Sequence, residues 1–230
     1  NISYLEGTFD SNSNKVVLTY RDGGNSDYGT AIVGTISGDS VSFGTPTVFE
    51  SATTVFTSAT FDSSNNKVVI AYADNGNSNY GTAIVGTVSG TGISFGSASV
   101  FESANTNSPS ATFDSSNNKV VISYRDNGNS SYGTSIVGTV SSTSISFGSA
   151  TVFESAEVAF ISSAFDTTNN KVVVCYADAG NSNIGTAIVG TVSSTSISFG
   201  TAAVFSGSEQ GYYSNAAFNP DTGTVGVAYQ

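Results

Sequence analysis

The sequence predicts an all-β protein, a β-propeller of four-stranded antiparallel blades. Three observations support this class: a 52-residue repeat, four strand-like segments in each copy, and apolar residues on both faces of those segments. Between 61–104 and 113–156, 37 of 44 aligned positions are identical. The repeat is marked by a recurring Phe-Asp pair, which begins at Phe9, Phe61, Phe113 and Phe165.

The second copy shows the expected elements most clearly. Its predicted strands are Thr57 to Phe61, Lys67 to Ala73, Thr82 to Ser89 and Ile93 to Glu102. Turns rich in Asn, Asp, Ser and Gly separate these strands, because such residues accept left-handed backbone and bond to neighbouring amides. Along the second strand Val68 and Ile70 alternate with other apolar residues, so both faces of the sheet must be covered.

A propeller blade fits this pattern because each blade is sandwiched between two neighbours. A β-solenoid would need a shorter repeat, and independent sandwich domains would leave one face of each sheet solvated. The strand-one positions carry small residues such as Ser58 and Ala59, which suit a narrow central axis. The single Cys175 falls at a small-residue position and is predicted to be a buried thiol.

We expect residues 1–230 to form one propeller domain with four complete blades and a partial fifth. The repeats are 1–52, 53–104, 105–156, 157–208 and the partial 209–230, which supplies two strands. A five-position ring with an incomplete blade is favoured over a four-bladed ring with an added hairpin, or a window on a longer array. The unpaired edge near Tyr229 is predicted to be covered, and other copies of the chain are one possible cover. A chain that starts at Asn1 and lacks Met is expected to be a processed product or an excerpt of a longer polypeptide.

Composition excludes several classes of function. The net charge is −11, with six basic side chains scattered among 17 acidic ones, so no nucleic-acid partner is expected. No apolar window is long enough for a membrane span. The chain has no His and one Cys, which rules out the usual zinc ligand sets, His-based catalytic triads and an intrachain disulfide.

The most suggestive motif is the loop Asp-x-Gly-Asn-Ser-x-(Tyr/Ile)-Gly-Thr between strands two and three, which recurs in four copies. Strand alternation puts these loops, and most of the carboxylates, on one face of the predicted ring, which concentrates negative potential there. The loop tyrosines offer flat amphipathic surfaces for a sugar, although packing on the adjacent blade is the favoured interpretation. The candidate ligand-binding residues are Asp22, Tyr28, Asp74, Asn77, Tyr80, Glu102, Asp126, Asn129, Tyr132 and Asp178.

Calcium is the one metal that these loops could attract, because it needs six to eight oxygen ligands. Each loop supplies few carboxylates, so an ordinary turn held by Asx side-chain bonds is favoured, and no cofactor is expected. The candidate metal ligands are Asp22, Asp27, Asp74, Asp126 and Asp178.

The segments Phe113 to Tyr124, Gly133 to Val140 and Ile145 to Gly148 resemble repeats in large tail-fibre-like structural proteins of marine bacteriophages, of the cyanophage type. The resemblance covers the whole chain and implies an extracellular or virion-surface location. It carries no catalytic residue over to this sequence.

Three functions compete at this point. A non-enzymatic recognition module would display repeated loops to a host-surface glycan or protein and gain avidity from several weak sites. A structural spacer or assembly protein of a virion, sheath or cell surface would join neighbouring chains through the incomplete fifth blade. A hydrolase would need two opposed carboxylates, and no such pair stands out, so an enzyme is not expected.

Overall fold

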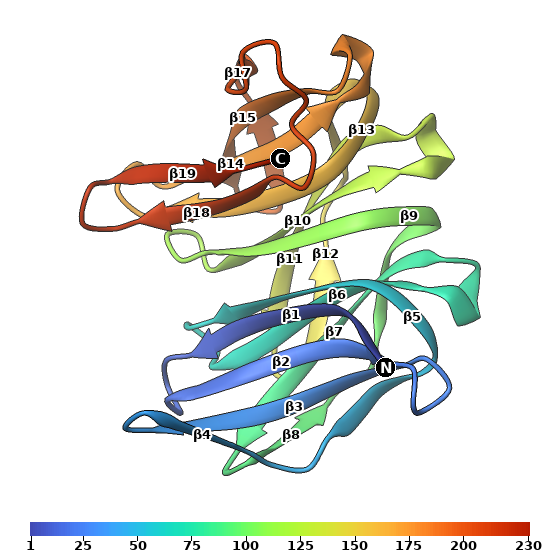
Figure 1. Cartoon of the computed structure of the whole chain (residues 1–230), viewed down its shortest axis with the longest axis vertical. Coiled ribbons are helices and arrows are strands. Elements are labelled where there is room, and N and C mark those ends of the chain that lie inside the picture. The colour runs from blue at the N-terminus through green and yellow to red at the C-terminus, as the bar shows by residue number, and fades with distance from the viewer. The chain divides into compact units, whose positions relative to one another are not determined.

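The computed structural model describes residues 1–230 and is built almost entirely of antiparallel strands (Figure 1). The first repeat contains β1 (Ile2–Asp10), β2 (Lys15–Asp22), β3 (Tyr28–Ser37) and β4 (Ser40–Phe43). The second contains β5 (Thr47–Asp62), β6 (Lys67–Asp74), β7 (Tyr80–Ser89) and β8 (Gly92–Phe95). The third contains β9 (Ser99–Asp114), β10 (Lys119–Asp126), β11 (Tyr132–Ser141) and β12 (Ser144–Phe147).

The fourth repeat and the partial fifth complete the chain. The fourth contains β13 (Thr151–Asp166), β14 (Lys171–Asp178), β15 (Ile184–Ser193), β16 (Ser196–Phe199) and the short β17 (Ala203–Val204). The fifth is the hairpin of β18 (Asn215–Asn219) and β19 (Thr224–Ala228). Three single 3-10 turns, η1 (Asn75–Asn77), η2 (Asn127–Asn129) and η3 (Ala179–Asn181), lie in the loops after β6, β10 and β14. The predicted all-β class is confirmed, and the fifth repeat contributes the two strands of this hairpin.

The strand pairings connect β1 to β17 as one open 17-stranded sheet, and β18–β19 form a separate sheet. Contacts divide the chain into two compact units: unit 1 is Asn1–Asn105 with Val140–Ser146, and unit 2 is Thr106–Thr139 with Phe147–Gln230. The strand order within a repeat is the simple meander that the sequence predicted, for example β5–β6–β7–β8.

The connection from strand four to the next strand one differs from the prediction. A loop was expected, whereas β5, β9 and β13 are continuous strands of 16 residues that leave one repeat and enter the next. Each strand bends at a break in register, where Phe56, Ser108 and Phe160 have φ of 54°, 47° and 52°. A bulge absorbs the change of direction within the strand, so Glu102, which was predicted to end strand four, lies inside β9.

Strand four itself is broken where a single strand was predicted. In the second repeat β8 ends at Phe95 and β9 begins at Ser99, although both pair with β7. Gly96 follows Phe95 at this break, where the backbone of another segment leaves no room for a side chain. At the equivalent Gly44, a Cβ would lie 1.9 Å from the carbonyl oxygen of Thr91. The turn of the next repeat therefore approaches the backbone closely at this point.

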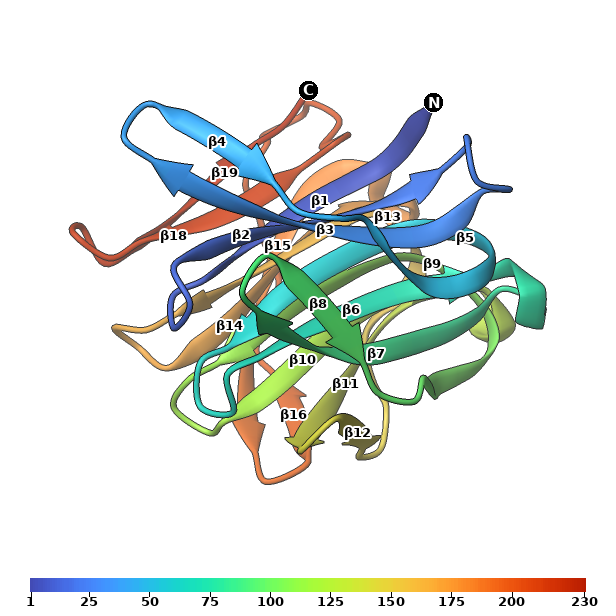
Figure 2. The same ribbon diagram turned by 90° about the horizontal axis from the view of Figure 1, so that it is seen from below.

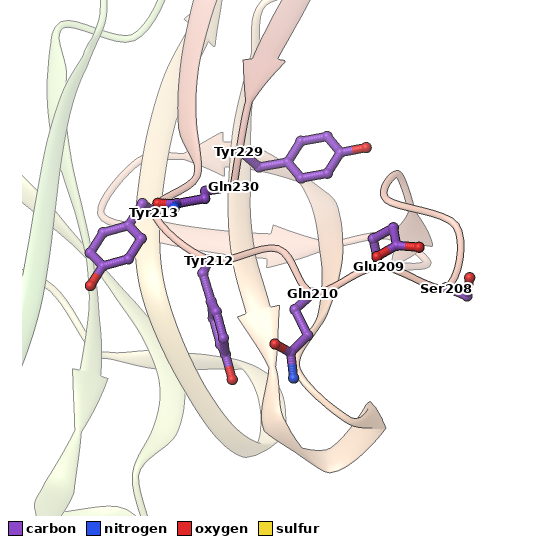
Figure 3. A pocket seen from close by; sticks show the side chains of 7 residues that line it. All are labelled: Ser208, Glu209, Gln210, Tyr212, Tyr213, Tyr229 and Gln230. Carbon is purple, nitrogen blue, oxygen red and sulfur yellow. The ribbon is translucent and has the colours of Figure 1, made fainter.

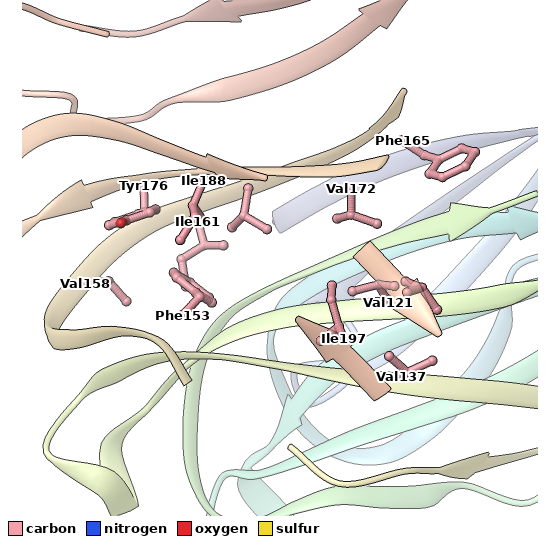
Figure 4. Packing of buried hydrophobic residues seen from close by; sticks show 12 residues of the cluster. Val121, Val137, Phe153, Val158, Ile161, Phe165, Val172, Tyr176, Ile188 and Ile197 are labelled. Carbon is pink, nitrogen blue, oxygen red and sulfur yellow. The ribbon is translucent and has the colours of Figure 1, made fainter. Parts of the chain in front are cut away.

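We refer to the strands of each repeat as the sheet of that repeat. The hydrophobic core lies between the sheets of neighbouring repeats within each unit. In unit 1, Val17 and Val33 of the first repeat pack against Val68, Ile70 and Ile84 of the second. In unit 2 the same layers recur, with side chains of the third repeat packed on those of the fourth; Figure 4 shows Val121, Val137, Phe153, Val172, Ile188 and Ile197 in this cluster. The expected two-sided burial is confirmed, because every residue from Val68 to Ala73 has no exposed surface.

The inner strands approach each other closely through small residues. The hydroxyl oxygens of Ser110 and Ser163 lie 2.9 Å apart, and Ser110 also accepts from the amide of Ser163. Cys175 is fully buried, as predicted. The hairpin strands β18 and β19 lie side by side in both views (Figures 1 and 2), and β19 pairs with β18 alone. The expected cover of the edge near Tyr229 is therefore not supplied by another strand of the chain.

Candidate functional site

The repeated loops between strands two and three are turns, and in the first and third copies the first aspartate caps the turn. Asp126 accepts hydrogen bonds from the amides of Gly128 and Asn129 at 2.9 and 3.1 Å, and Asp22 accepts from Gly24 at 2.9 Å. In the second copy, burial raises the pKa of Asp74, while the amides of Gly76 and Asn77 act in the opposite direction.

The candidate ligand-binding residues, which we call the rim residues, lie at the facing ends of strands two and three and in the turns between them, with Glu102 in β9. Each loop tyrosine begins strand three and pairs with the aspartate that ends strand two, as Tyr80 does with Asp74. Strand pairing also sets Glu102 opposite Gly81, so Asp74, Tyr80 and Glu102 lie at one end of the second sheet. The equivalent pairs are Asp22 with Tyr28, Asp126 with Tyr132, and Asp178 with Ile184.

The rim residues differ in exposure. The loop tyrosines Tyr28, Tyr80 and Tyr132 are half-buried, whereas Asn77 and Asn129, which end their 3-10 turns, are exposed. No group of three or more acidic or Cys side chains converges anywhere in the chain. The candidate calcium ligands Asp22, Asp27, Asp74, Asp126 and Asp178 are thus distributed one or two to a loop.

The glutamate at the end of strand four has a structural partner. The buried Tyr72 donates its hydroxyl to Glu50 at 3.1 Å, and Tyr176 donates to Glu154 at the same distance. Burial and the neighbouring Asp74 raise the pKa of Glu50. The hydrogen bond from a buried tyrosine to a glutamate therefore recurs in the second and fourth repeats.

The arginines of the first and third repeats each pair with an acidic side chain. Arg21 bonds Asp27 at 2.8 Å, which lowers the pKa of that carboxyl group. Arg125 bonds Glu157 at 2.8 Å. The first repeat thus pairs its arginine with Asp and the third repeat with Glu.

The connection from the fourth repeat to the fifth departs from this regular pattern. Where earlier copies continue as one strand, β17 ends at Val204 and the chain enters a turn at Gly207, whose φ is +65°. Ser206 holds the turn, because its hydroxyl accepts from the amide of Gly185 at 2.8 Å and donates to the carbonyl of Glu209. Gly211 packs so closely on β15 that a Cβ would lie 2.3 Å from the Cα of Gly185.

This turn leaves a pocket at the end of unit 2. Its volume is about 570 Å³, and three tyrosines, two glutamines, a serine and a glutamate line it. Figure 3 shows the lining residues Ser208, Glu209, Gln210, Tyr212, Tyr213, Tyr229 and Gln230. The side chains of Tyr212 and Gln210 point in the same direction, and Tyr213 points away from them.

The aromatic rings of the pocket pack on two half-buried phenylalanines, Phe160 and Phe205. The Tyr212 and Tyr213 rings lie 5.2 and 4.5 Å from the ring of Phe160, and the Tyr229 ring lies 5.3 Å from Phe205. Tyr213 and Tyr229 are nevertheless 67% and 45% exposed. The rings are thus supported from below and open to solvent above.

Tyr229 shows why the pocket is open. It occupies the position of Tyr72 and Tyr176, which are fully buried and bonded to a glutamate. In the last repeat Ser206 stands where Glu154 stands in the repeat before, and it bonds the turn instead. The Tyr229 hydroxyl therefore remains available to a ligand.

Sequence reasoning missed this pocket, although a signal was present. The fifth repeat is offset by one residue, and the segment Ser206 to Gly211 replaces a stretch that begins with Glu and forms a strand in the other copies. This offset marks the place where one copy differs from its equivalents.

The overall structure is similar to that of a solved lectin. The chain matches the SapL1 lectin, solved in complex with α-methyl fucoside, with a TM-score of 0.56 and 12% sequence identity. The match covers 98% of this chain and 71% of the lectin chain. At this identity the likeness establishes a shared all-β fold. No family model and no curated protein matches the sequence.

The structure contains no helix of the length and apolarity that crossing a bilayer requires.

Proposed function

We propose that this protein is a non-enzymatic carbohydrate-recognition module of propeller architecture, and that the tyrosine-lined pocket is its principal binding site. The observation that carries the proposal is the set of three exposed or half-exposed tyrosine rings beside Gln210 and Glu209. The fold shared with a fucoside-bound lectin supports the same conclusion.

The chemistry of the pocket matches that of a sugar. A pyranose has apolar C–H faces that pack on aromatic rings, and hydroxyl groups that exchange hydrogen bonds with amides and carboxylates. A volume of about 570 Å³ lies within the usual range for ligand pockets. Recognition of this kind needs no metal and no cofactor, so a chelator should leave it unchanged.

The rim loops are proposed as weaker, repeated contacts. Asp22 with Tyr28, Asp74 with Asn77 and Tyr80, Glu102, Asp126 with Asn129 and Tyr132, and Asp178 present similar polar surfaces in successive repeats. Several weak contacts to one glycan-bearing surface add avidity. The resemblance to phage tail-fibre repeats supports an extracellular or virion-surface setting, with a host-surface glycan or protein as the partner.

The experiment is a calorimetric titration with α-methyl fucoside, followed by a panel of glycans. Substituting Ala for Tyr213, which is exposed, or for Tyr229 should weaken binding at least tenfold without changing the melting temperature. Tyr80→Ala in the second repeat is the matched control and should reduce binding little. Loss of binding in Tyr80→Ala but not in Tyr213→Ala would move the site to the rim, and absence of binding to every glycan would refute the proposal.

A structural or assembly role is the second candidate, and one observation favours it. The first sheet exposes large apolar side chains, including Ile2, Leu5, Val41 and Phe43, at 49% to 57%. Solvent-exposed apolar clusters of this kind mark interaction surfaces.

A further inference from the structure

We propose that this protein associates head to tail, with the outer face of its first sheet bound to the C-terminal end of a second copy. We define the N-terminal face as Ile2, Leu5, Leu18, Ile32, Val41 and Phe43. Apart from Phe43 and Val41 on β4, these residues lie on β1, β2 and β3. Together with Tyr20, most of them line an apolar groove of about 240 Å³.

The internal repeats show that this face is built to be covered. Val41 is 54% exposed, whereas the equivalent Ile93 and Ile197 are 6% and 4% exposed. Leu18 is half-buried, whereas the equivalent Ile70 has no exposed surface. The side chains at these positions are all aliphatic, so the difference in their exposure comes from what packs on them.

The covering surface in the internal copies is known. In unit 1 the second repeat's face is covered by Val17, Ala31 and Val33, which project from the opposite face of the first repeat. In unit 2 the fourth repeat's face is covered in the same way by Val121 and Val137 of the third. The chain therefore forms this apolar interface twice between its own repeats.

The complementary surface is left open at the C-terminal end of the chain. Val189 is 43% exposed, whereas its equivalents Val33 and Val137 have no exposed surface. The hairpin β18–β19 packs on β13 and β14, which are the inner strands of the fourth repeat, and leaves β15 less covered. Each chain thus exposes one half of the repeated interface at its N-terminal end and the other half at its C-terminal end.

A second copy is the partner that these two surfaces fit. The open surfaces carry the same kinds of side chain as the surfaces that meet within the chain, because Leu18, Ile32, Val41 and Phe43 correspond to Ile70, Ile84, Ile93 and Phe95, and Val189 corresponds to Val33 and Val137. Such contact is heterologous, because different patches meet, so it generates either a closed ring of chains or an open filament.

Light scattering on fractionated protein tests the proposal with two single substitutions. Val41→Glu places a charge on the N-terminal face, and Val189→Glu places one on the C-terminal surface; both residues are already substantially exposed, so the fold should tolerate the change. Wild type should show oligomers whose population grows with concentration, and each variant alone should be monomeric. The control is Val152→Glu, whose side chain is 42% exposed although its repeat is internal, and it should associate like wild type.

Mixing the two variants gives the sharpest result. Each variant keeps one intact surface, so an equimolar mixture should form a 1:1 dimer and stop there. A dimer that needs the same patch on both chains would not be restored by mixing. A wild-type chain that stays monomeric at every concentration, or a mixture that stays monomeric, would overturn the proposal, and neither result bears on sugar binding at the tyrosine pocket.

Discussion

The packing between repeats is tested by the same truncation at two equivalent positions of unit 1. Ile70 is fully buried against the first repeat, whereas Leu18 occupies the same place in the first repeat and is only half-buried. Ile70→Ala removes three carbon atoms, worth about 2.4 kcal/mol of transfer free energy at roughly 0.8 kcal/mol each. The cavity left between the sheets brings the expected loss to about 3 to 4 kcal/mol.

Leu18→Ala also removes three carbon atoms, but from a half-buried side chain that leaves no enclosed cavity. About half of the transfer free energy is lost, so we expect roughly 1 kcal/mol. Guanidinium titration followed by circular dichroism measures both variants, at a dilution where light scattering shows monomers. Equal losses at the two positions would refute the reasoning, because they would mean that the N-terminal face is covered in the monomer.

Three further predictions concern single groups. Burial and Asp74 raise the pKa of Glu50, so the folded state binds its proton more tightly than the unfolded chain; stability from this group is present at low pH and is lost as pH rises from about 4.5 through the folded pKa. The Glu50→Gln variant should show a smaller loss over that range in pH-dependent denaturation. Burial raises the pKa of Cys175 to about 11, so the native thiol should resist a thiol reagent at pH 8 and react after unfolding; rapid native labelling would contradict this. Gly44→Ala should destabilise unit 1 by several kcal/mol or prevent folding, because the new Cβ would overlap the carbonyl oxygen of Thr91, and a melting temperature within a few degrees of wild type would contradict that contact.

The sequence predicts the second and third strands of each repeat almost to the residue. The second copy was expected at Lys67 to Ala73 and Thr82 to Ser89, and the structure has Lys67–Asp74 and Tyr80–Ser89. These strands are framed by turn residues whose local chemistry is strong, such as Asp62, which accepts from the amides of Ser64 and Asn65. Local signals of this kind do not depend on the rest of the fold.

The fourth strand could not be predicted in the same way, because its shape depends on the neighbouring repeat. Gly96 breaks the strand where a turn of another repeat approaches, and Phe56 bends β5 in a left-handed conformation that propensity disfavours. Both features come from packing between distant segments. The pocket was missed for a related reason. It forms where Ser206 replaces the glutamate of the other repeats, and no motif marks that position.

The near identity of the repeats separates the scaffold from the candidate site. The loop between strands two and three has nearly the same sequence in four repeats, so a substitution in one copy leaves the other three unchanged. We interpret these loops as turns that also present weak polar surfaces. The segment from Ser206 to Tyr213 occurs once, replaces a glutamate that would satisfy Tyr229, and keeps three tyrosines open to solvent on a phenylalanine base. Exposing an aromatic ring to water is unfavourable, and the packing of the repeats does not require it here. A bound ligand that covers the rings therefore explains the segment from Ser206 to Tyr213 better than the fold does.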